Sequence, residues 1–388
     1  MQEDFHYYAT YCAAYLAGHS PEECREISYC DQLVDLCSKT FLTVLNAPRA
    51  AATTQLQLEL MEARTDLVGL QDITRIWSSF HFLPRDLHAD PGRGGKRYRH
   101  KYQLICGPNG ELLADTVELA RGHGMQAVGI AMHILADTWA HQYFAGTPSL
   151  VINDTNRYFF ELLGEGAEAQ ERPAHFRHNP SAPDDLEQGL YANSVYQQSE
   201  TSIMNLGHGR AGHLPDYSFA RYRYMPAWAN YEEILKDNPS DYWHAFCQMV
   251  YAMRCLREGK PFEVAHYDFT AASSWEQDIR SIFTKRQLDS SDDWRALGER
   301  MVGTALEPFD LQKYQQEYLS ATEREKDGTF LGQFFVAALA QKSMVTNRIF
   351  QTGSLLAGFS LDYEEKGFGG IKDYIRLVRR VSEEMSHE

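Results

Sequence analysis

The chain carries apolar and polar side chains at helical spacing over most of its length. Residues 4–18 predict a first helix, and 21–45 predict a second that begins with Ser20 as N-cap, Pro21 in the first turn and two acidic residues after it. Further helical patterns cover 110–121, 125–143, 185–206, 240–259, 273–288, 290–306, 310–325, 328–350 and 371–385. We therefore expect a mainly α fold.

Two stretches depart from the helical pattern. Residues 98–113 predict a short β-hairpin that turns at Pro108, Asn109 and Gly110. Residues 147–185 are rich in Pro, Asn and Asp and show little periodicity, which predicts a long connecting loop or an insertion.

The segment 129–146 is apolar except for three ionisable side chains, His133, Asp137 and His141, which recur every four residues. At about 100° per residue they project from one helix face, and such groups are costly to bury unless they are paired or bound. Two imidazoles and a carboxylate are typical zinc ligands. Because helical rise separates the two histidines by roughly 12 Å, we expect two neighbouring ions that share Asp137. A buried polar network between helices is the alternative.

Other candidate ligands lie upstream. Asp4 and His6 are two residues apart, so they diverge on a helix, and we select His6. Asp31 and Asp35 lie one turn apart among apolar residues, and we select Asp35 as a metal ligand or as a catalytic residue. His81 lies in an aromatic segment that ends in a proline.

A glycine-rich loop supplies further candidates. His208, His213 and Asp216 place two imidazoles and a carboxylate within a short span, where glycines allow close approach of the backbone. We expect the two histidines to bind metal and Asp216 to take part in catalysis.

A basic segment follows His81. Arg93, Lys96 and Arg97 stand among glycines with further cations close by, an arrangement that suits a phosphate or carboxylate group on a substrate. A solvated loop is the alternative.

Composition narrows the function classes. The net charge of −16, from 37 basic and 53 acidic residues, disfavours broad binding to nucleic acid or an anionic membrane. Neither a secretory signal nor a membrane-length apolar run is present, so we expect a cytoplasmic protein without a membrane span. Seven cysteines without a CxxC pair predict reduced, buried thiols. Nucleophile-elbow, P-loop, HExxH and Rossmann motifs are missing.

The metal motifs resemble those of the zinc-dependent phospholipase C and single-strand-specific nuclease superfamily. More closely, DFHYYATYCAAYLAG, HILADTWAHQYFAG and GHGRAGHLPD resemble an uncharacterised bacterial family thought to be distantly related to it. The resemblance covers about residues 1–225 and implies a paired zinc centre bridged by Asp137, with His141 at a further ion beside His208, His213 or Asp216. The implied ligands of the paired centre are His6, Asp35, His81, His133 and Asp137.

The enzymes of that superfamily also use the amino-terminal nitrogen as a ligand. In this chain five residues precede His6. We therefore leave Met1 out of the predicted ligand set.

We expect a metal-dependent hydrolase of phosphate esters with two or three zinc-type ions. Its metal-binding helical domain covers 1–225, and a helical region over 226–388 packs on it. The expected partner is a small-molecule or phosphate-ester substrate, and we expect no stable nucleic acid partner. The alternative is a noncatalytic helical protein with a structural metal site or a buried polar network.

Overall fold

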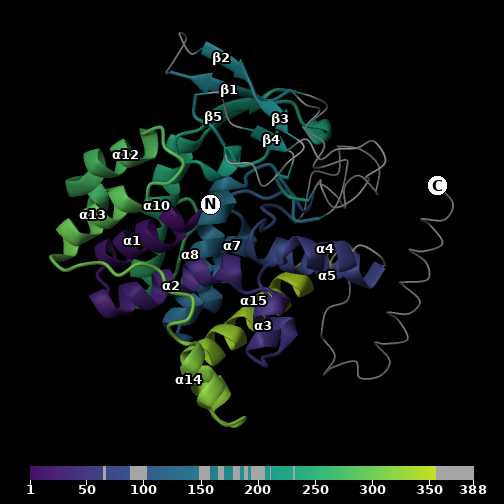
Figure 1. Ribbon diagram of the computed structural model, residues 1–388, viewed down its shortest axis with the longest axis vertical. Helices are drawn as coiled ribbons and strands as arrows, with labels where there is room; N and C mark the ends of the chain where they lie inside the picture. Colours follow the sequence, from purple (N-terminus) through teal and green to yellow (C-terminus); the bar gives the residue numbers. More distant parts are fainter. Residues whose placement is uncertain are drawn as a thin grey trace.

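The computed structural model describes residues 1–63, 67–87, 103–147, 158–164, 170–177, 184–187, 191–193, 206–209, 211–229 and 232–354 (Figure 1). Its helices are η1 (Asp4–Ala9), α1 (Thr10–Leu16), α2 (Pro21–Leu36), α3 (Lys39–Val44), η2 (Arg49–Ala51), α4 (Gln57–Ala63), α5 (Leu67–Phe80), α7 (Glu111–Leu119), α8 (Gly124–Ala140), η5 (Leu214–Asp216), η6 (Ala227–Ala229), α10 (Asn238–Glu258), α11 (Phe269–Ala272), η7 (Ser273–Trp275), α12 (Glu276–Thr284), α13 (Ser291–Val302), α14 (Gln315–Ser320), η8 (Lys326–Gly328) and α15 (Phe330–Gln351). The predicted mainly α fold is confirmed.

Helix α8 runs through the middle of the helical body (Figure 1). It packs against α2, α10, α15 and α7, and every residue from Gln126 to Ala140 is buried. A helix that is apolar on all sides needs partners on all sides, which explains its central position. The polar positions His133 and Asp137 are therefore surrounded by protein.

Helix α2 begins as the sequence predicts but ends earlier. The Ser20 side chain accepts from the Glu23 amide and the Glu23 carboxylate accepts from the Ser20 amide, which completes a capping box. The expected continuation to residue 45 is wrong, because α2 ends at Leu36 and Ser38 caps a separate helix, α3, by accepting from the Phe41 amide at 3.1 Å. Asp31 and Asp35 consequently lie in the last two turns of α2.

An antiparallel sheet covers one end of the helical body (Figure 1), in the strand order β2-β1-β5-β6. Its strands are β1 (Phe160–Leu163), β2 (Gln170–Pro173), β5 (Arg221–Tyr224) and β6 (Ile234–Asp237), and a separate parallel pair joins β3 (His175–Arg177) to β4 (Tyr191–Asn193). The segment expected as a loop therefore contains three strands. The helix expected over 185–206 is wrong at 191–193, which pair with β3.

The expected hairpin over 98–113 is wrong in its second arm, because residues 111–113 begin helix α7. Residues 98–102 of its first arm lie outside the described residues. Cys106 bridges Pro84, and Ile105 bridges Ala145. The Cys106 amide donates to the Phe144 carbonyl at 2.7 Å, so this short segment pairs with the chain that follows α8 rather than with itself. Long-range pairing of this kind leaves no signal in local periodicity.

The remaining expectations concern thiols and membranes. All seven cysteines are free and buried, as predicted. Among the helices of the described ranges, none combines the length and apolar character needed to cross a bilayer. The helical pattern over 371–385 lies outside the described residues.

Gly129 sets the approach of α8 to α2, which generates a prediction. A Cβ at this position would lie 2.4 Å from the Ile27 carbonyl oxygen and 2.6 Å from the Cys30 Cβ. We expect Gly129→Ala to lower the free energy of unfolding by about 1–3 kcal/mol, because the two backbones must separate. Urea denaturation measures the loss. Gly328→Ala is the control, since its Cβ would meet no atom within 4 Å; equal stability of the two variants would contradict the prediction.

Candidate metal centre

Four donor side chains converge beside α8, and we call Asp35, His81, His133 and Asp137 the first ligand group. His133 Nε2 lies 3.2 Å from His81 Nδ1, and each of these nitrogens lies 3.2 Å from Asp137 Oδ2. Asp35 Oδ1 lies 3.7 Å from His81 Nδ1 and 3.8 Å from His133 Nε2. A zinc tetrahedron with bonds of about 2.0–2.1 Å has donor-to-donor edges of roughly 3.3 Å. These five donor-to-donor distances, 3.2 to 3.8 Å, are therefore close to the edges of a zinc tetrahedron.

The outer ring nitrogens of this group show which atoms carry protons. His81 Nε2 lies 3.0 Å from the Thr53 carbonyl oxygen, and His133 Nδ1 lies 2.9 Å from the Asp31 carbonyl oxygen. Because a carbonyl only accepts, both outer nitrogens must donate. The inner nitrogens are then left to face one another beside a carboxylate, so that a proton or a metal ion must lie between them.

A second ligand group consists of His141, His208 and Asp216, whose donor atoms lie within 4.8 Å of one another. His141 follows the last residue of α8, and its Nδ1 donates to the His81 carbonyl at 2.7 Å while Nε2 lies 3.2 Å from Asp216 Oδ1. His208 Nδ1 donates to the Gly212 carbonyl at 2.8 Å, and its Nε2 lies 3.5 Å from Asp216 Oδ2. Both rings again turn one nitrogen to a carbonyl and the other to a carboxylate.

The π-helical segment η1 brings the beginning of the chain to Asp137. His6 Nε2 lies 3.4 Å from Asp137 Oδ1 and, although buried, makes no hydrogen bond within the described residues. The Met1 amino nitrogen lies 2.8 Å from the same oxygen and 3.4 Å from Asp216 Oδ1. We call Met1, His6 and Asp137 the third ligand group. One oxygen of Asp137 thus faces the first group and the other faces the third.

Charge balance in the centre favours cations. Burial raises the pKa of Asp137, but His141 and the Met1 amine lower it by more, and the net pKa lies well below its ordinary value. Burial likewise opposes charge on His133, yet Asp137 and Asp35 raise its pKa to about 10. The same kind of attraction raises the pKa of the Met1 amine to about 11. Protons occupy the centre at neutral pH where divalent ions would otherwise balance the carboxylates.

Two other histidines have the opposite shift. Burial lowers the pKa of His208 to about 4 and also lowers the pKa of His81. Both rings are therefore neutral at pH 7, which is the form that binds metal.

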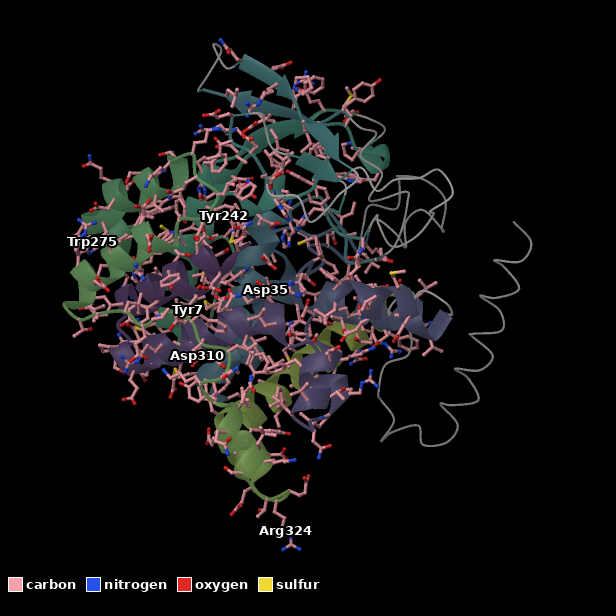
Figure 2. All side chains as sticks on the ribbon, viewed as in Figure 1. Tyr7, Asp35, Tyr242, Trp275, Asp310 and Arg324 are labelled. Carbon is pink, nitrogen blue, oxygen red and sulfur yellow. The ribbon has the colours of Figure 1, made fainter. Side chains whose placement is uncertain are left out.

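The centre lies within the helical body, but some of its side chains are partly exposed. Figure 2 shows Asp35 near the middle of the molecule, in the last turn of α2. The side chains of Asp35, His208 and Asp216 are 29%, 19% and 11% exposed, whereas His6 and His133 are fully buried. The first and second groups therefore include side chains that are partly exposed to solvent.

The structure brings together most of the residues predicted from the sequence: His6, Asp35, His81, His133, Asp137, His141, His208 and Asp216. It places His213 apart from the three groups, because His213 Nδ1 pairs with Asp184 Oδ2 at 2.9 Å and its side chain is 54% exposed. The basic residues Arg93, Lys96 and Arg97 lie outside the described residues.

Sequence reasoning missed two participants. The Met1 amine has no local signal, because its place depends on how η1 packs. Asp31 was passed over in favour of Asp35, although both contribute: Asp31 contacts the outer nitrogens of His6 and His133. Its spacing of four residues from Asp35 on α2 was the available signal.

Comparisons with known proteins assign the chain to a family but do not assign it a function. Neither the curated proteins nor the solved structures contain a match to this chain. The model of DUF6765, a family of unknown function, matches residues 1–349, which include all three ligand groups. The chain therefore belongs to the DUF6765 family.

Proposed function

We propose that this protein is a metal-dependent hydrolase of phosphate esters with two or three zinc-type ions. The observation that carries the proposal is the position of Asp137, whose two oxygens face different ligand groups. A carboxylate shared in this way is how ions about 3.5–4 Å apart are held in phosphatases and nucleases. The superfamily resemblance implies the same sharing at Asp137.

The partly exposed side chains of the centre support a catalytic role over a structural one. Structural zinc sites close the shell with four protein ligands, whereas catalytic sites keep a position for water or substrate. The second group supplies three side chains and includes the partly exposed His208 and Asp216. A phosphate oxygen or a water molecule can complete such a shell.

The chemistry follows from paired ions and from the carboxylates beside them. Such ions lower the pKa of a bound water to near 7 and polarise the phosphoryl oxygen. Asp35 and Asp216 are both partly exposed, and either can orient the attacking water. Arg93, Lys96 and Arg97 remain our predicted contacts to the nonreacting anionic part of the substrate.

A first prediction compares two ligands of α8. Asp137→Ala should remove more metal than His141→Ala, because Asp137 serves the first and third groups and His141 serves only the second. Elemental analysis after exhaustive dialysis measures the ions retained per chain. Asp268→Ala is the control, since Asp268 accepts from the Ala271 amide and pairs with Arg254, outside the ligand groups. Equal metal losses at Asp137 and His141 would count against bridging.

A second prediction concerns protons. Ion binding should release protons and weaken as pH falls, because His133, with a pKa of about 10, and the Met1 amine, with a pKa of about 11, hold protons in the metal-free centre at pH 7. Calorimetry in two buffers with different ionisation enthalpies measures the protons released. A Zn²⁺ affinity independent of pH from 6 to 8, without proton release, would show that ions bind elsewhere.

A third prediction concerns activity. The metal-loaded protein should hydrolyse small phosphate esters, and replacing Lys96 and Arg97 with alanine should lower kcat/KM without changing metal content, because these cations contact substrate rather than ions. The assay is a panel of phosphomonoesters, phosphodiesters, amides and carboxylic esters. Turnover of amides or carboxylic esters alone would refute the phosphate assignment. If protein with its full metal content hydrolyses no substrate of the panel, the result would favour the noncatalytic metal protein.

A further inference from the structure

Asp31 is a fully buried carboxylate whose two oxygens have separate partners. Asp31 Oδ2 accepts from the Thr10 hydroxyl at 2.6 Å, and Asp31 Oδ1 accepts from His6 Nδ1 at 2.7 Å. The same Oδ1 lies 3.1 Å from His133 Nδ1. One oxygen atom therefore contacts two imidazoles.

Those imidazoles belong to different ligand groups. His133 directs Nε2 into the first group, and His6 directs Nε2 toward Asp137 Oδ1 in the third. The two rings stack with centroids 3.9 Å apart and planes 21° from parallel. Asp31 and the stacking together hold both rings in one orientation.

Asp31 itself accepts hydrogen bonds rather than binding an ion. His6, Asp31 and His133 lie close enough to hold a metal. However, His133 Nδ1 also lies 2.9 Å from the Asp31 carbonyl oxygen, which requires a proton on that nitrogen. A protonated nitrogen has no lone pair for an ion, so His133 can bind metal only through Nε2.

We propose that Asp31 is a positioning residue that couples metal binding at the first and third ligand groups. The inference rests on the proposed metal centre and names a residue that controls how its ions load. Asp31 sets the tautomer of His6 through its carboxylate and that of His133 through its backbone carbonyl and its carboxylate together, and this leaves each Nε2 free for metal.

The coupling has a physical route through the shared oxygen. An ion on one imidazole withdraws electron density from the ring, which makes its Nδ1–H a better donor and tightens its bond to Asp31 Oδ1. Because the Thr10 hydroxyl holds Oδ2, the tightened carboxylate cannot turn away and stays placed for the second ring. Binding of the first ion therefore favours binding of the second.

The test is titration of metal-free protein with Zn²⁺, and with Co²⁺ for its visible spectrum, in wild type and Asp31→Asn. The asparagine keeps the shape but loses the negative charge and one acceptor oxygen. We expect affinity to fall about 10–100-fold at both positions and the binding curve to lose its cooperativity. Thr10→Val should keep both ions and lower only the cooperativity.

A matched control separates positioning from general destabilisation. Asp268→Asn makes the same chemical change at a carboxylate that accepts from the Ala271 amide and pairs with Arg254, neither of which belongs to a ligand group. It should lower thermal stability without changing Zn²⁺ affinity or the Co²⁺ spectrum. If it alters affinity as much as Asp31→Asn does, the positioning role of Asp31 is overturned.

A double-mutant cycle tests the coupling directly. His6→Ala should weaken the ion held by Asp35, His81 and His133 in the wild-type background, and by a smaller factor in the Asp31→Asn background. Equal factors in both backgrounds would overturn coupling through Asp31. Wild-type protein that binds neither Zn²⁺ nor Co²⁺ would instead overturn the metal centre itself, so the two failures are distinguishable.

Discussion

A charged carboxylate in a dry interior is the constraint on which this structure depends. Asp137 is 1% exposed and lies in a stretch of α8 whose residues are all buried. An isolated ionised group in such a place costs several kcal/mol, so the surrounding chain must supply positive charge and donors. Helix α8 and the turn after α5 each bring an imidazole to this carboxylate, and the beginning of the chain brings a third imidazole from η1 and the Met1 amine.

Close helix packing is the second requirement of the centre. Gly129 allows the α8 backbone to approach α2 at Ile27 and Asp31, and this approach brings the Asp31 carbonyl to His133. The orientation of His133 Nε2 thus depends on a glycine one turn before His133 on the same helix. Packing and chemistry cannot be varied independently at this contact.

Much of the candidate site could be predicted because its signal is local. His133, Asp137 and His141 share one face of an apolar helix, and His6, Asp35 and His81 each stand as polar residues among apolar ones. The place of Met1 depends on a contact with Asp137, 136 positions away. Asp31 shares its spacing signal with Asp35, but its separate role depends on a contact with His133, 102 positions away. The same reason explains the error at 98–113, where pairing is to Pro84 and Ala145. His213 has the residue type of a ligand, but it pairs with Asp184, and the spacing of residues along the chain does not indicate that pair.

The contact between Met1 and Asp137 has a consequence for folding kinetics. It joins residues 136 positions apart, and Met1 also reaches Asp216, so the loops closed at the centre are long. Closing long loops costs entropy before any contact compensates for it, and contacts of this kind form late in folding. The helices are then assembled before the ligand groups are complete, and an ion can enter only a chain that is already nearly native. Bound metal would slow unfolding more than it speeds folding, so it would lengthen the lifetime of the native state.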